Sequence, residues 1–388
     1  MFYLVILFVL CATAIMIDIG MAKPGIPDSS RDQKWLNFAT VCLLIYIAGF
    51  RNMGGSDFSI YATIYANSPD LKDFFEDYAY LHDHYFLLGI DKGYVFINSL
   101  MKTIGFTYFG YNFIHSCVCF LLVYFGTRKY TNNFSIVIMV LLYKMFFYDF
   151  FISLRQTITI AVFLSMLGDI EKKHPVRYFL LCIFCYWIHA ASIVLFVVYF
   201  VRYLKLSQKT IILLNVIFIP TLLLSILNVP VLKIFDTILD WDIFGSDVIA
   251  EKAAGLLQGD VETGINWLHT IEYFGMMFLL TLTFDDIKET FPQSDMMIKL
   301  FLCLLPIFTL FRNYEILTRW KDYFTISYGF LFSYLAGIQN RRYRRAVMYF
   351  VILWVGIGFF RYINVFDEGI FRSYFPVRGM VDLYKRPF

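Results

Sequence analysis

Charged residues are scarce in this sequence. Asp, Glu, Lys and Arg make up 16% of its 388 residues, whereas soluble globular domains carry about 25%. The sequence also contains no internal repeat, no low-complexity segment and no stretch with the composition of a soluble domain. These absences exclude an ordinary soluble protein. The formal net charge of +3 says little by itself, and nothing indicates a nucleic-acid partner.

Cysteine is also rare, and its placement argues against a disulfide framework or a zinc site. All seven cysteines lie inside apolar runs, where cysteine behaves as a small buried hydrophobe. They are Cys11, Cys42, Cys117, Cys119, Cys182, Cys185 and Cys303. His82-Asp83-His84 is typical of a solvated loop, and the histidines have no partner ligands at metal-binding spacing. We therefore expect no metal and no cofactor.

The sequence does contain many apolar runs long enough to cross a bilayer, and 59% of its residues are hydrophobic. They predict an all-α polytopic membrane protein, a single integral membrane domain over residues 1–388, with about 12 transmembrane helices (range about 10–14). The N-terminal run lacks a basic segment and a cleavage site, so we expect a retained helix. The expected spans are 2–19, 35–50, 108–127, 134–150, 153–170, 178–203, 211–228, 267–283, 297–311, 322–338 and 346–360, with a shorter apolar piece at 93–104.

Charge sets the expected orientation. Two long polar loops, at about 51–92 and 229–266, are acidic, whereas basic clusters occur at residues 128, 172, 202 and 341. Because Lys and Arg favour the cytoplasmic side, the acidic loops are predicted to be periplasmic. This orientation requires residues 178–203 to form two short helices with a hinge near Trp187-Ile-His189. One long helix is the alternative.

The stretch Arg51-Asn-Met-Gly-Gly-Ser-Asp57 lies where an apolar span meets the first acidic loop. An arginine fork can hold a phosphate, glycines allow close backbone approach to a ligand, and Asp57 could act as a base. The alternative is an ordinary helix C-terminus with a glycine stop and an interfacial arginine.

Arg155-Gln156 and His189 lie in apolar surroundings. An ionisable group at membrane depth is a candidate functional residue, although Arg155 could instead snorkel to the headgroups. Imidazole titrates near neutrality and could move a proton, but a lone histidine is more often structural.

Arg312, Arg319 and Tyr323 are spaced to share one face of a continuous helix. Two guanidinium groups two turns apart would suit a diphosphate. Glu315 could also pair with both arginines, and the two interpretations are compatible.

These pieces together resemble the EpsG-like branch of the Wzy polysaccharide polymerases. The residues that carry the resemblance are Arg51-x5-Asp57 with Tyr61, Asp91-x-Gly93-Tyr94, Arg155-Gln156, His189 with Ser192, and Arg319-x3-Tyr323-Phe324. They follow the family's order over most of the chain. Asp91 stands where the family more often has Glu, and Phe375-Pro376-Val377 replaces the usual Pro-Tyr.

The resemblance implies a GT-C-like glycosyltransferase of the bacterial inner membrane. It would transfer a growing undecaprenyl-diphosphate-linked glycan onto an undecaprenyl-diphosphate-linked repeat unit at the periplasmic face, without a metal ion, in O-antigen, capsule or exopolysaccharide synthesis. Arg155, Arg312 and Arg319, assisted by Arg51, would bind the diphosphate together with Gln156 and Tyr323. Asp57, Asp91 and His189 would be the candidate bases.

Two other functions stay open at this point. An O-antigen ligase uses the same donor but is expected to have one very large periplasmic loop, whereas both loops here are about 40 residues long. A flippase for lipid-linked sugars is expected to be built from internal repeats. The expected partners include membrane lipid. The sequence leaves open whether a chain-length regulator protein also binds.

Overall fold

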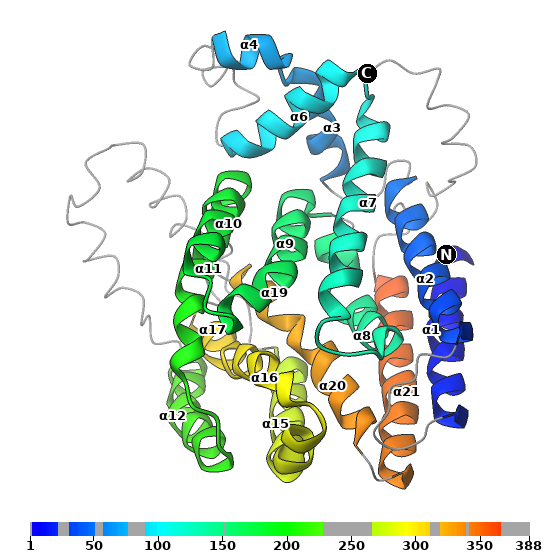
Figure 1. Cartoon of the computed structure of the whole chain (residues 1–388), viewed down its shortest axis with the longest axis vertical. Coiled ribbons are helices and arrows are strands. Elements are labelled where there is room, and N and C mark those ends of the chain that lie inside the picture. The colour runs from blue at the N-terminus through cyan, green and yellow to red at the C-terminus, as the bar shows by residue number, and fades with distance from the viewer. Residues whose placement is uncertain are drawn as a thin grey trace, which may run out of the picture. The chain divides into compact units, whose positions relative to one another are not determined.

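The computed structural model describes residues 2–21, 31–50, 57–76, 90–150, 152–227, 266–310, 319–338 and 341–365 (Figure 1). All regular structure in these ranges is helical, and they contain no strand. The prediction of an all-α protein is therefore confirmed. The chain divides into two compact units, one of Met1–Phe196 with Phe332–Phe388 and one of Val197–Leu331.

The first unit is built around the packed helices α2, α7 and α9, with α10 against α9 and α1 against α2 and α21. Asn112 of α7 donates hydrogen bonds to the last carbonyls of α2, those of Ala48 and Gly49, at 2.9 and 3.2 Å. The helices of this unit are α1 (Phe2–Met21), α2 (Arg31–Gly49), α3 (Phe58–Asn67), α4 (Leu71–Glu76), α6 (Lys92–Ile104), α7 (Tyr108–Thr127), α8 (Phe134–Leu141), the π-helix η1 (Leu142–Phe150), α9 (Leu154–Glu171), α10 (Pro175–Ile188), the 3-10 turn η2 (Ala190–Ile193) and α21 (Arg341–Val365).

The second unit contains α12, α15, α16, α17 and α19, and α12 packs against α15 and α17. Tyr273 of α15 stacks on Phe301 of α16 with 4.8 Å between the ring centroids. The bounds are η3 (Tyr199–Tyr203), α12 (Gln208–Ile226), α15 (Trp267–Thr290), η4 (Pro292–Ser294), α16 (Asp295–Leu302), α17 (Leu304–Leu310) and α19 (Trp320–Thr325). Two helices cross the boundary between the units, α11 (Val194–Val198) and α20 (Ser327–Gly337).

The helix boundaries agree with the apolar runs over most of the described chain. The expected break near Trp187-Ile-His189 is confirmed, because α10 ends at Ile188 and His189 is extended, with φ −152° and ψ 112°. Two expectations were wrong. The polar loop expected after residue 283 is helical up to Thr290, and the first acidic loop contains the helices α3 and α4.

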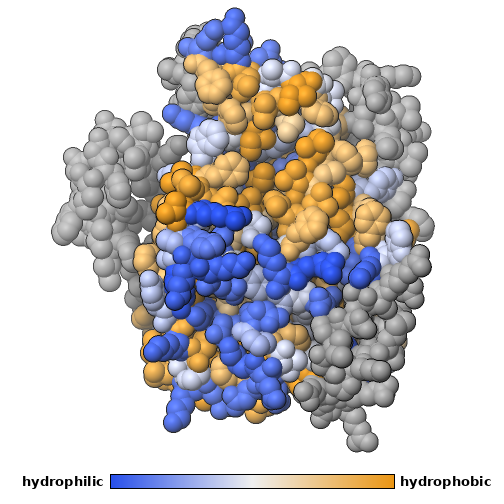
Figure 2. Space-filling model, in the orientation of Figure 1, coloured by the Kyte–Doolittle hydropathy of each residue, from blue (hydrophilic) through white to orange (hydrophobic). Residues whose placement is uncertain are grey.

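Three helical segments of the described chain are long and apolar enough to cross a membrane: Tyr108–Thr127, Gln208–Ile226 and Pro292–Leu310. Shorter apolar helices occur at Val5–Met16, Lys34–Gly49, Phe134–Phe146, Pro175–Ile188 and Ala190–Tyr203. Large apolar side chains reach the surface, and Figure 2 shows them over broad areas of the visible face. Such areas are what a bilayer-facing surface requires. The total of about 12 spans stays a prediction.

Helices α3, α4 and α6 pack together at one end of α7 and α10 (Figure 1). Lys102 of α6 donates to the carbonyl oxygens of Ala66 and Ser68, at 3.0 and 2.7 Å, and so holds the C-terminus of α3. Tyr65 of α3 donates its hydroxyl proton to the carbonyl oxygen of Phe106, at 2.6 Å. These bonds fix α3 and α6 as one cap on the first unit.

We expect Tyr65→Phe to destabilise the protein by about 1 kcal/mol, the usual cost of one lost hydrogen bond. Burial raises the pKa of Tyr65 to about 12. Since the folded protein holds this proton more tightly than the unfolded chain, the stabilisation is complete below about pH 10 and is lost as the pH rises toward 12. The unfolding temperatures of the detergent-solubilised wild type and Tyr65→Phe, each taken at pH 8 and pH 11, measure both the cost of the substitution and the alkaline loss of stability. If the unfolding temperature of Tyr65→Phe falls between pH 8 and pH 11 as much as that of the wild type, Tyr65 is not the source of the alkaline loss of stability.

Candidate functional site

The N-terminus of α6 packs directly on the C-terminus of α10. A Cβ atom at Gly93 would lie 2.6 Å from the carbonyl oxygen of Trp187, so only glycine allows the two backbones to approach this closely. Phe96 also packs on the Trp187 ring, with 5.2 Å between centroids. The approach places Asp91, the N-cap residue of α6, beside His189, the residue that follows α10.

The first turn of α9 is held by buried polar contacts. His115 of α7 places its Nε2 atom 3.0 Å from the carbonyl oxygen of Leu154, which it can only approach as a donor. Thr157 donates to the carbonyl oxygen of Ser153 at 3.0 Å, and its hydroxyl also contacts the carbonyl oxygen of Asp149 in η1. Arg155 therefore projects from a turn that has little freedom to move.

Asp91, Arg155 and His189 form one cluster. Arg155 Nη1 donates to Asp91 Oδ2 at 2.8 Å, and His189 Nδ1 lies 3.8 Å from the same oxygen. The side chains of Asp91 and Arg155 are 16% and 19% exposed, and that of His189 is 7% exposed. A charge-assisted bond with this degree of burial is stronger than a surface ion pair.

Two tyrosines lie beside this cluster. Tyr61 of α3 hydrogen-bonds the Arg155 side chain, and its ring packs edge-on against Tyr94 with 5.6 Å between centroids. Burial raises the pKa of Tyr94 well above its usual value of 10, so this phenol stays neutral and cannot serve as a base. Tyr94 therefore does not compete with the ion pair for a proton.

The arrangement can bind an anion and move a proton. The Nε atom of Arg155 is buried and has no hydrogen-bond partner among the residues that the structure describes, so the guanidinium keeps donor capacity beyond its bond to Asp91. His189 Nδ1 lies 3.8 Å from a carboxylate oxygen, which is too far for a hydrogen bond but close enough to attract a protonated imidazole. An arginine beside a carboxylate–imidazole pair suits a reaction in which an anionic group leaves and a hydroxyl loses a proton.

Comparison with protein families gives a match over residues 34–375 to the model of the EpsG family. The chain belongs to the EpsG family. The matched range includes Asp91, Arg155, His189 and Arg319. Comparison with curated proteins and with solved structures gives no significant match. Family membership and the apolar helices together identify a membrane protein, and the EpsG family points to a polysaccharide polymerase.

The other predicted site residues of this EpsG-family chain are placed less completely. Asp57 precedes α3, one turn before Tyr61, and so begins the helix that contacts Arg155. Gln156 is the next residue after Arg155 in α9 and is buried. Arg51 lies outside the described residues. The roles predicted for these residues stay predictions.

The arginine-rich segment near residue 319 belongs to the second unit. Arg319 precedes α19 and its carbonyl oxygen accepts from the amide of Asp322 at 3.2 Å. Tyr323 lies one turn further along and is fully buried. Arg312 and Glu315 lie outside the described residues, so a shared helical face with Arg319 stays a prediction.

Sequence reasoning missed two buried polar residues of the first unit. His115 holds the turn that carries Arg155, and its position inside an apolar run was the signal that could have found it. Asn98 of α6 is completely buried, and neither its amide nitrogen nor its oxygen has a partner in the part of the chain that the structure describes. A buried amide without partners is a site where water or a polar ligand group can bind.

Proposed function

We propose that this chain is a polysaccharide polymerase of the bacterial inner membrane. It transfers a growing glycan from undecaprenyl diphosphate onto the terminal sugar of an undecaprenyl-diphosphate-linked repeat unit at the periplasmic face. The product is O-antigen, capsule or exopolysaccharide. The observation that carries the proposal is the Asp91–Arg155–His189 cluster in a chain of the EpsG family.

In the proposed reaction, an acceptor hydroxyl oxygen attacks the anomeric carbon of the donor sugar. The bond from that carbon to the diphosphate oxygen breaks, and the diphosphate leaves with the bonding electrons. The acceptor hydroxyl loses its proton to a base. The developing negative charge on the diphosphate is the main electrostatic problem, and preorganised guanidinium groups solve it without a metal ion.

The roles follow from this chemistry. Arg155 binds the leaving diphosphate, and Arg51, Arg312 and Arg319 are proposed to add further positive charge. The pairing of Asp91 with Arg155 favours His189 as the base that takes the proton, with Asp91 orienting both side chains. Asp57 is the alternative base, and Gln156 and Tyr323 are proposed to support the bound substrate. Holding two lipid-anchored substrates in one site supplies much of the rate by positioning.

The proposed orientation follows the distribution of charge. Arg155 and His189 lie at one end of the antiparallel pair α9 and α10, and the basic residues Lys172, Lys173 and Arg177 lie at the other end. Because positive residues favour the cytoplasm, the end with the cluster would face the periplasm.

The experiment that tests the function uses the purified protein in detergent with a lipid-diphosphate-linked repeat unit, EDTA and no nucleotide sugar. We expect a ladder of repeats on a glycan gel. Transfer only to a lipid A core would indicate a ligase. Movement of the labelled lipid across a liposome bilayer without a ladder would indicate a transporter. Either of these results would overturn the proposal.

A further inference from the structure

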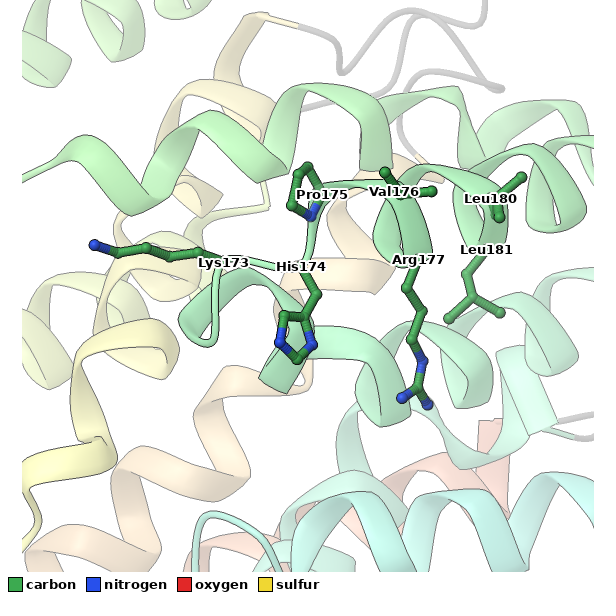
Figure 3. Close-up of a pocket in the computed structure, with 7 residues that line it drawn as sticks. All are labelled: Lys173, His174, Pro175, Val176, Arg177, Leu180 and Leu181. Carbon is green, nitrogen blue, oxygen red and sulfur yellow. The ribbon is translucent and has the colours of Figure 1, made fainter.

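An open groove of about 650 Å³ lies at the turn between α9 and α10 (Figure 3). It is lined by Lys173, His174, Pro175, Val176, Arg177, Leu180 and Leu181. Three of these residues carry basic groups, none carries an acidic group, and the other four are apolar. Figure 3 shows the side chains of His174 and Arg177 extending in the same direction, with Leu181 next to Arg177. The groove wall is therefore mainly hydrocarbon, and its lining residues include three with basic groups, of which Lys173 extends in a different direction from His174 and Arg177.

Two of the three basic side chains, those of His174 and Arg177, contact the same acidic residue. Asp169, near the end of α9, lies 3.4 Å from Arg177 Nε and 3.7 Å from His174 Nδ1. The side chains of Arg177 and His174 are nevertheless 73% and 57% exposed. The contact with Asp169 uses Nε of Arg177, so its terminal nitrogens remain for a second, exposed anion such as a phosphate.

The apolar half of the groove faces outward. Val176 and Leu180 are 73% and 61% exposed, and they lie one turn apart on α10. Large apolar side chains next to mobile basic ones are costly in water but suit the boundary between headgroups and acyl chains. A phosphate on the basic half would leave an attached acyl chain lying along Val176 and Leu180.

Lys173 supplies a further observation. Its φ of 61° is the only positive φ of a non-glycine residue among the described residues. The amides of Lys173 and His174 donate to the carbonyl oxygens of Ile170 and Asp169, at 3.3 and 2.9 Å, so the turn is a helix-ending motif that usually has glycine at this position. A lysine with a positive φ has a conformational cost that glycine would not have. A role for its ammonium group in the groove would account for a lysine at this position.

The groove is distinct from the Asp91–Arg155–His189 cluster. α10 has 14 residues between the groove at its start and His189 after its end, which corresponds to about 20 Å along the helix axis. A phosphate held in the groove is therefore too far from the cluster to contact its reacting groups. The proposal does not rest on the proposed polymerase reaction.

We propose that this groove binds an anionic phospholipid of the surrounding membrane. The lipid phosphate contacts Arg177, Lys173 and His174, and the first part of one acyl chain packs on Val176 and Leu180. The chemistry that is recognised is a phosphate that carries net negative charge and is joined to hydrocarbon. A zwitterionic phosphatidylcholine lacks the net charge, and inorganic phosphate lacks the chain.

The test is a binding titration on the purified full-length protein in neutral detergent, with fluorescent phosphatidylglycerol as the probe. Unlabelled phosphatidylglycerol should displace the probe, whereas phosphatidylcholine and inorganic phosphate should not. We expect Arg177→Gln and Lys173→Gly each to weaken binding about fivefold, the effect of about 1 kcal/mol for one basic residue near an anionic lipid.

Lys173→Gly separates binding from folding. Glycine adopts a positive φ without strain, so this variant should unfold at the same temperature as the wild type or higher while binding the lipid more weakly. Arg128→Gln is the matched control, since Arg128 follows α7 at the same end of the unit but does not line the groove. Equal displacement by phosphatidylcholine, full displacement by inorganic phosphate, unchanged affinity in Lys173→Gly, or an equal loss in Arg128→Gln would each overturn the proposal.

Discussion

Arg155→Ala is expected to lower the rate of glycan polymerisation by about two to three orders of magnitude, the usual effect of removing one preorganised group that stabilises developing charge. The 2.8 Å bond to Asp91 holds the guanidinium in place before substrate arrives, so little reorganisation is needed during the reaction. Arg155→Lys should also be strongly impaired, because an ammonium group cannot contact Asp91 and a phosphate with the same planar fork. The measurement is the initial rate of ladder formation by purified protein.

A structural role of the ion pair predicts a different pattern. Removing one partner leaves the other charge partly buried and unpaired, whereas removing both restores balance. Asp91→Ala/Arg155→Ala should therefore unfold at a higher temperature than Arg155→Ala, yet it should stay inactive. Recovery of polymerisation in the double variant would show that the pair only supports the fold. Arg361→Gln, at an exposed position on α21, is the control for loss of one positive charge.

Full activity of Arg155→Ala would remove Arg155 from the site and with it the observation on which the proposed roles rest. The family assignment would be unaffected, since it depends on the match over residues 34–375.

The sequence predicted the helices well where apolar runs end at polar or glycine residues. The run at 108–127 corresponds to α7, and the break at His189 follows from the need to return the chain across the membrane. It predicted α3 and α4 poorly. Their apolar residues, such as Phe58, Ile64 and Phe74, are buried against α6 and α7, and within an acidic segment this packing could not be seen before the partner helices were known.

The contacts within the candidate site were likewise not predictable from the sequence. Arg155 and His189 were recognised as polar residues in apolar surroundings, and Asp91 was singled out by the resemblance to the family. That Arg155 pairs with Asp91, however, depends on a contact between residues 64 apart in the chain. No local pattern encodes such a contact. The interpretation of the sequence therefore assigned Asp91 as a candidate base and Arg155 as a phosphate ligand, each by itself. In the structure the two side chains bind each other.

The glycine that brings Asp91 to His189 provides the most specific test of this geometry. We expect Gly93→Ala to destabilise the protein by about 1–3 kcal/mol, the usual cost of overpacking, and to reduce polymerisation strongly. The new Cβ would lie 2.6 Å from the carbonyl oxygen and 2.7 Å from the carbonyl carbon of Trp187. Backbone atoms cannot rotate away as a flexible side chain can, so α6 must shift and carry Asp91 with it.

Gly168→Ala is the matched control, since Gly168 lies within α9 and a Cβ there would meet nothing within 4 Å. Alanine should stabilise that helix by about 0.5–1 kcal/mol and leave the site intact. The added Cβ would also lie 2.7 Å from the Trp187 ring, but removing the ring leaves the carbonyl group in place, so Gly93→Ala/Trp187→Ala should not recover activity. The unfolding temperatures of the three variants and their rates of glycan-ladder formation test this interpretation. If Gly93→Ala behaves like Gly168→Ala, the close approach of α6 to α10 is not what positions Asp91 beside His189.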